Sequence, residues 1–198
     1  MKKIKVFDLA ICAVATALVY VFTAFVNIRL PIGGAGGIIH LGNIPLFIFA
    51  IFCGKKTGMI CGGIGMALFD LLSGWTIWAP FTLVIVGAMG YVMGVFSHKK
   101  PTYLRVTIGI VLAIIIKIVG YYFAELIIYG NAIAPFSSIP GNVIQVGLAG
   151  IVTLVAFKPI AIATKNFRKD SISIDEDEPI EDTVSDNDAT VNNASASR

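Results

Sequence analysis

The sequence predicts an all-α polytopic membrane protein with six transmembrane helices and both termini in the cytosol. First, 57% of the 198 residues are hydrophobic and 14% are charged, whereas about 25% of a typical soluble domain is charged. Second, the apolar residues form runs that are too long and too numerous for one soluble core to enclose. Third, the basic residues gather in alternate connections between these runs.

Each predicted span is an apolar run bounded by charged residues, glycine or proline. The first run is too long for the apolar region of a signal peptide, and no small-residue cleavage site follows it, so it is interpreted as a span. We predict spans at about residues 8–26, 41–53, 57–72, 80–96, 103–129 and 141–163. Residues 1–168 are expected to form one six-helix domain, and the acidic residues 169–198 a disordered cytosolic tail.

The positions of lysine and arginine set the predicted orientation. They lie at both ends of the chain and in the connections after the second and fourth spans, while the other connections hold only Arg29. The positive-inside rule therefore places both termini in the cytosol. Residues 31–37 are Gly-rich but lack the ending of a phosphate loop, so we expect an extracellular loop there.

Polar side chains from three spans are predicted to lie at one depth, in the outer half of the membrane. Counting the rise per residue from the cytosolic edge places Asp70 at about 21 Å. The same count places Lys117 at about 18 Å and Tyr121 at about 24 Å. On the last span, Gln145 lies at about 20 Å and Asn142 at about 24 Å. Ionisable groups inside a membrane are costly and usually functional.

These side chains share faces that should point away from lipid. Lys117, Tyr121 and Glu125 recur every fourth residue along one helix. Amides, a tyrosine and both charge signs at one depth suit a small, planar, hydrogen-bonding ligand that binds from outside. Four residues near the outer surface are expected to cap this region: His40, Asn43, Trp75 and Trp78.

Two alternatives remain open at this point. Asp70 and Lys117 would also suit an internal ion pair that holds helices together, and the tryptophans would suit an ordinary interfacial belt. No cysteine–histidine cluster has metal-ligand spacing, and no catalytic arrangement of Ser, His or paired Asp falls at one depth. We therefore expect no enzyme activity, no metal, no cofactor and no nucleic-acid partner.

Small residues line the first and third spans. Ala13 and Ala17 form a small-xxx-small pair that lets another helix approach closely. The third span carries Gly58, Gly62, Gly63 and Gly65, for which packing inside the bundle is the favoured interpretation.

Over about residues 7–164 the chain resembles the substrate-binding S components of energy-coupling factor (ECF) vitamin transporters, in the group around riboflavin, hydroxymethylpyrimidine and pyridoxine uptake. The resemblance rests on the combination of residues 41–43, 54–58, 62–65, 70–74 and 78–82. Asn43 and Val86 stand where many relatives carry Asp and Lys.

The resemblance implies a vitamin held near the outer face and a complex with a transmembrane coupling subunit and two ATPase subunits in a bacterial cytoplasmic membrane. It also implies that Ala13 and Ala17 contact the coupling subunit. The leading prediction is a vitamin-binding subunit for a pyridoxine- or hydroxymethylpyrimidine-like substrate. Lys117 and Asp70 would anchor it, Asn142 and Gln145 would bind ring heteroatoms, and Trp75 or Trp78 would stack on it. The alternatives are a riboflavin-specific S component and a self-sufficient small-molecule carrier.

Overall fold

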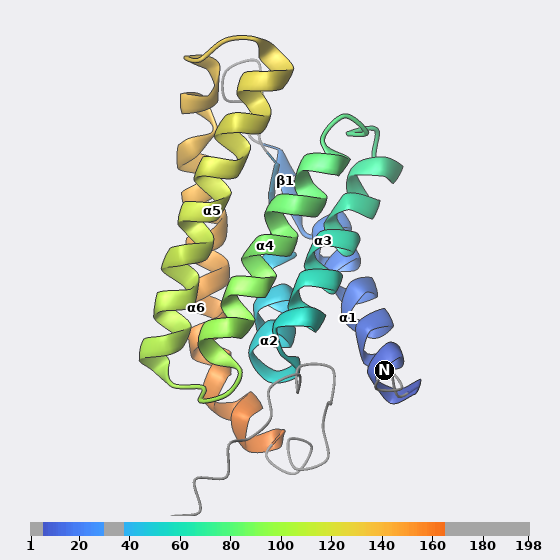
Figure 1. The fold of residues 1–198 in the computed structure, drawn as a ribbon, viewed down its shortest axis with the longest axis vertical. Helices are drawn as coiled ribbons and strands as arrows, with labels where there is room; N and C mark the ends of the chain where they lie inside the picture. The colour runs from blue at the N-terminus through green and yellow to red at the C-terminus, as the bar shows by residue number, and fades with distance from the viewer. Residues whose placement is uncertain (1–5, 30–37, 165–198) are drawn as a thin grey trace, which may run out of the picture.

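The computed structural model describes residues 6–29 and 38–164, which form six α-helices, a two-stranded antiparallel sheet and a short 3-10 helix (Figure 1). Our predictions for the Gly-rich residues 31–37 and the tail 169–198 lie outside the described residues. In chain order the elements are α1 (Val6–Phe25), β1 (Asn27–Arg29), β2 (Ile38–His40), α2 (Asn43–Cys53), α3 (Lys55–Leu72), α4 (Ala79–Ser97), α5 (Tyr103–Tyr129), η1 (Ala134–Ser137) and α6 (Ile139–Ala163).

The helices begin and end within two residues of the predicted boundaries, and the boundaries have local causes. Thr102 precedes α5 and accepts the backbone N–H of Arg105 at 3.3 Å, as an N-terminal cap does. Gly130 ends α5 with a φ of 62°, a left-handed conformation that favours glycine. Gly54, with a φ of 96°, separates α2 from α3 in the same way.

The prediction of six helices is confirmed, whereas only four of them are long and apolar enough to cross a membrane unaided. These are α1, α4, α5 and α6 with the preceding η1. The 11 residues of α2 rise about 16 Å, roughly half of the hydrocarbon thickness. The 18 residues of α3 include Lys55, Lys56 and Asp70 and are therefore less apolar. The number of full crossings and the side of each terminus remain predictions, although α1 begins and α6 ends at the same end of the bundle (Figure 1).

The outer surface of the bundle is apolar and its interior is partly polar. On α5, Ile115, Val119 and Phe123 are exposed along one face, while Lys117 and Glu125 are buried on another. This distribution is the reverse of the amphipathic pattern of soluble proteins and is the one that hydrocarbon requires.

Glycines bring α3 close to its neighbours, as the sequence predicted. A Cβ atom on Gly58 would lie 2.7 Å from the carbonyl oxygen of Gly90, on α4. One on Gly63 would lie 2.7 Å from the carbonyl oxygen of Leu83, also on α4. The glycines therefore serve packing within the bundle, and α3 makes its most extensive helix contact with α4.

The strands were not predicted. β1 and β2 pair antiparallel, with Asn27 opposite His40, and the Leu41 N–H extends the pairing by donating to the Val26 carbonyl at 3.1 Å. β2 lies against α6, so this hairpin brings the segment before α2 next to the last helix.

Candidate ligand-binding site

A chain of hydrogen bonds joins α5, α6 and β2 in the interior. The Lys117 ammonium donates to Gln145 Oε1 at 2.8 Å, and Gln145 Nε2 donates to the His40 carbonyl at 3.2 Å. Lys117 and Gln145 are each 2% exposed. A buried ammonium needs such partners because an isolated buried charge is costly.

A second group of side chains joins α4 to α5. The hydroxyls of Thr82 and Tyr121 lie 3.1 Å apart, and the Trp78 ring lies 6.2 Å from the Tyr121 ring and 6.1 Å from the Tyr129 ring. Lys117 Nζ lies 5.5 Å from the centroid of the Tyr121 ring, within the range of a cation–π contact. Tyr121 thus connects the aromatic group to the chain of hydrogen bonds that begins at Lys117.

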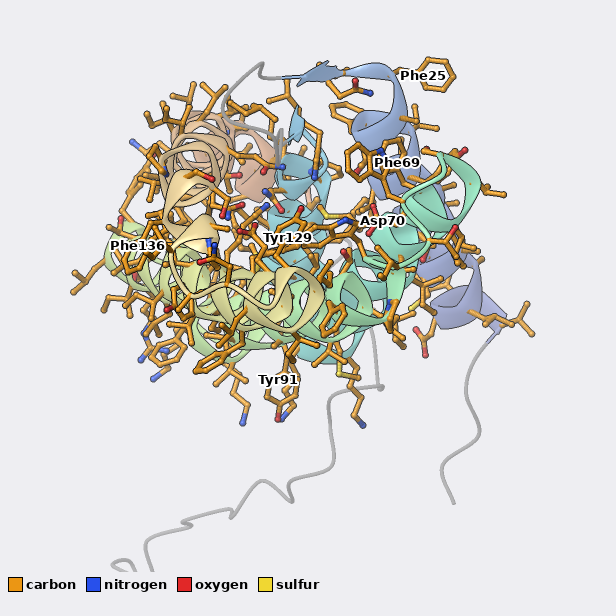
Figure 2. The ribbon with its side chains drawn as sticks, turned by 90° about the horizontal axis from the view of Figure 1, so that it is seen from above. Phe25, Phe69, Asp70, Tyr91, Tyr129 and Phe136 are labelled. Atoms are coloured by element: carbon orange, nitrogen blue, oxygen red, sulfur yellow. The ribbon has the colours of Figure 1, made fainter. Side chains whose placement is uncertain are left out.

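Within the described part of the chain, several buried polar atoms of the predicted site have no hydrogen-bond partner. They are both side-chain polar atoms of Asn43, which is 0% exposed, one oxygen of Asp70 and one oxygen of Glu125. Figure 2 shows Asp70 and Tyr129 toward the middle of the bundle, whereas Phe25 and Phe136 lie at its rim. Leaving such a group unsatisfied costs about 1–3 kcal/mol. These atoms are therefore where a ligand or ordered water would be bound most favourably.

The charged groups of this region interact at longer range. Asp70 is within electrostatic reach of Lys117 and Tyr121, and Tyr121 is also within reach of Glu125. Among the described residues, Lys117 donates its short hydrogen bond to Gln145 and not to Asp70. The alternative of a direct ion pair clamping two helices is therefore not what the structure contains.

His40 contributes mainly through its backbone. Its ring Nδ1 accepts the Gly42 N–H at 3.3 Å, which a protonated Nδ1 could not do. Burial, and secondarily the nearby Lys117 ammonium, lower the pKa of His40 well below its usual value of 6.5. The imidazole is therefore neutral at physiological pH.

Two predicted site residues stand apart from these contacts. Within residues 6–29 and 38–164, the partly buried Asn142 side chain has no hydrogen-bond partner and the Trp75 ring stacks on no other ring. Conversely, Thr82 and Tyr129 belong to the cluster although sequence reasoning did not select them. Helical spacing could have indicated both, since Thr82 follows Trp78 by four residues and Tyr129 follows Glu125 by four.

A groove of about 380 Å³ between α4 and α5 is a separate feature. Its walls are apolar and include Val84, Ile85 and Phe123. These side chains offer nothing to a hydrogen-bonding ligand, so the groove does not compete with the polar cluster as a vitamin site.

The predicted docking residues on α1 are exposed. Ala13 and Ala17 face outward, whereas Cys12, Ala15 and Val19 are buried. The small-residue pair therefore lies on a solvent- or lipid-accessible face of α1 and is not buried within the described part of the chain.

Comparison with known proteins relates this arrangement to a transporter family. The family model for the S component of the ECF-type riboflavin transporter matches residues 3–162. The chain is 35% identical over 131 residues to an uncharacterized protein of Pyrococcus woesei, covering 63% of this chain and 88% of that protein. It is 29% identical over 167 residues to the thiamine precursor transporter HmpT of Lactococcus lactis subsp. cremoris, and the match covers 81% of this chain and 93% of HmpT.

Among solved structures, the crystal structure of FolT bound with folic acid matches with a TM-score of 0.64 at 21% identity. The match covers 81% of this chain and 95% of FolT. At this identity the likeness establishes a shared fold.

Proposed function

Because the chain belongs to the family of S components of ECF-type riboflavin transporters, we propose that it is the substrate-binding subunit of an ATP-driven vitamin importer in a cytoplasmic membrane. The observation that carries this proposal is the polar cluster inside an otherwise apolar bundle. The cluster combines hydrogen-bonded Lys117 and Gln145 with buried polar atoms that lack partners on Asn43, Asp70 and Glu125.

The proposed substrate is a small heterocyclic vitamin or precursor of the pyridoxine or hydroxymethylpyrimidine type. Lys117 and Asp70 would anchor it, Gln145 and Asn142 would bind ring heteroatoms, and Trp78 would stack on its face. The relative HmpT, a thiamine precursor transporter, supports a substrate of this size. Riboflavin is the second candidate because the matching family model is that of the S component of the ECF-type riboflavin transporter.

The proposed topology has six crossings, both termini in the cytosol and substrate binding from outside. Energy would come from two ATPase subunits acting through a transmembrane coupling subunit, which would dock on Ala13 and Ala17. Their exposure on α1 supports this role, because small residues allow close helix approach.

Binding is tested by mass spectrometry of ligand retained on the purified chain and by titration with pyridoxine, hydroxymethylpyrimidine and riboflavin. Lys117→Met should weaken binding at least about tenfold, since a hydrogen bond to a charged group is worth about 1.5–3 kcal/mol. Lys55→Met is the matched control, because Lys55 lies 5.9 Å from the exposed Tyr91 ring, outside the cluster. Equal affinities of the two variants, or no heterocycle retained from any growth medium, would contradict the proposal.

Coupling is tested separately with Ala17→Leu. Because Ala17 is exposed, the larger side chain should leave ligand affinity unchanged and abolish ATP-dependent uptake in vesicles that also hold the coupling and ATPase subunits. Uptake by this chain alone in liposomes would instead favour a self-sufficient carrier.

A further inference from the structure

The atoms left without partners at the site include two carboxylate oxygens. They are Asp70 Oδ2 and Glu125 Oε2. In the ionised form a carboxylate only accepts hydrogen bonds, so a molecule that satisfies these atoms in that form must bring N–H or O–H donors. Asn43 can both donate and accept and places no such restriction on the ligand.

The Glu125 carboxylate is within electrostatic reach of both tyrosines of the aromatic group, Tyr121 and Tyr129. Glu125 is 5% exposed and sits one helical turn from Tyr121 on one side and one turn from Tyr129 on the other. The Trp78 ring contacts both of these tyrosine rings. The Ser138 side chain, just before α6, also neighbours the Glu125 carboxyl group, so a ligand that reaches Glu125 would lie close to the aromatic group and to the start of α6.

Asp70 belongs to the same neighbourhood through Tyr121 and Thr82. Tyr121 is within electrostatic reach of both Asp70 and Glu125. The Thr82 hydroxyl, which lies 3.1 Å from that of Tyr121, also neighbours the Asp70 carboxyl group. The two carboxylates thus approach one tyrosine from α3 and from α5.

The charge balance of the cluster disfavours an anionic ligand. Lys117 is the one ammonium among the described residues of the cluster, and it already donates to Gln145. Asp70 lies within electrostatic reach of this cation, and Glu125 adds a second acidic group beside Tyr121. A phosphate ester or a carboxylate on the ligand would bring a further negative charge into a poorly solvated site, where like charges repel strongly.

We propose that the ligand is a non-anionic heterocycle with at least two N–H or O–H donors, and that the carboxylates of Asp70 and Glu125 accept them. This inference rests on the proposed function and narrows its substrate class. It selects the free alcohol or amine form of a vitamin over its phosphate ester or its carboxylate.

The test compares ligand pairs that differ in charge, on the purified full-length chain in nanodiscs. Pyridoxine is paired with 4-pyridoxic acid, in which a hydroxymethyl group becomes a carboxylate. Hydroxymethylpyrimidine is paired with its phosphate ester. The uncharged member of at least one pair should bind about 10- to 100-fold more tightly than the anion, the range expected for hydrogen bonds to charged groups.

Two variants that preserve side-chain shape link the preference to the carboxylates. Asp70→Asn and Glu125→Gln should each weaken binding of the uncharged ligand about tenfold or more and reduce its advantage over the anion. Asp8→Asn is the matched control. Asp8 is also a buried carboxylate without a hydrogen-bond partner, but it lies in the first turn of α1, at the opposite end of the bundle from the α3–α4 connection (Figure 1).

The outcomes separate this inference from the proposed function. An anion that binds as tightly as its uncharged partner, or a retained ligand that is an anionic heterocycle, would overturn the inference and leave a vitamin-binding subunit standing. An unchanged preference in both carboxamide variants would also overturn it. If a variant fails to fold, the ligand pairs still test the inference on the unmodified chain. No binding of any heterocycle would reject both.

Discussion

The close contact of α3 with α2 and α4 makes Gly58→Ala a test of the packing. The new methyl carbon would lie 2.6 Å from the Ala50 Cβ and 2.7 Å from the Gly90 carbonyl oxygen. Carbon contacts are favourable at about 3.5–4.0 Å, so the methyl is about 1 Å too close on two sides. Such overpacking costs about 1–3 kcal/mol. The cost should lie at the top of that range, about 3 kcal/mol, because the atoms that the methyl group meets include backbone atoms, which move less easily than side chains.

The helix propensity of alanine offsets part of this cost. Alanine is favoured over glycine by about 1 kcal/mol in a helix interior, which leaves a net loss of about 2 kcal/mol in the free energy of unfolding. For a chain of this size the melting temperature should fall by about 4–8 °C.

Thermal unfolding in detergent, followed with a thiol-reactive dye, measures this change because the thiols of Cys12 and Cys61 are buried in the folded chain. Gly147→Ala is the matched control. It makes the same substitution on α6, where nothing lies within 4 Å of the added carbon, and should raise the melting temperature by about 2–4 °C. A Gly58→Ala variant that melts at or above the unmodified chain would refute the packing argument.

Three further predictions concern the site. Gln145→Leu removes the partners of the Lys117 ammonium and the His40 carbonyl, so the free energy of unfolding should fall by about 2 kcal/mol or more in chemical denaturation; Gln145→Glu, which keeps an acceptor for the ammonium, should lose less. Because the pKa of His40 is lowered in the folded state, the unfolded chain binds more protons below about pH 6.5, and stability should fall as the pH drops through that value. His40→Gln should show a smaller drop in melting temperature between about pH 7.5 and 5.5, and an equal drop would contradict the assignment. Trp78→Phe should abolish the ligand-induced change in tryptophan fluorescence, whereas Trp75→Phe should retain it.

The sequence was sufficient to predict the helices and much of the polar cluster. Helix boundaries follow from glycine, proline and charged residues, which act locally, and this is why the range 103–129 was predicted to the residue. Counting also placed Lys117 and Gln145 at nearly the same depth, because a regular rise converts sequence position into depth, and the structure joins the two by a hydrogen bond. Depth alone could not decide which polar groups would pair, so an Asp70–Lys117 ion pair remained open until the structure placed Gln145 nearer.

Long-range backbone contacts could not be predicted in this way. The bond from Gln145 to the His40 carbonyl joins residues 105 positions apart and depends on a main-chain atom, which carries no side-chain signature. Likewise, the three-residue strands of the hairpin are too short to show a period-two pattern. The sequence showed that α2 is short. It did not show that the segment before α2 would pair as a hairpin and lie against α6.

The position of this segment connects the fold to the proposed function. In the proposed six-crossing topology the chain before α2 lies at the depth of the interior, because α2 rises only about half of the membrane thickness. Non-helical backbone at that depth is tolerated only where protein covers it or where it lines a cavity, since lipid cannot satisfy its N–H and carbonyl groups. The His40 carbonyl meets this requirement through Gln145, and the Gly42 N–H meets it through the His40 ring. The half-length helix thus holds polar backbone beside the cluster of Lys117 and Gln145, and a helix long enough to span the membrane would have carried that backbone out to the surface.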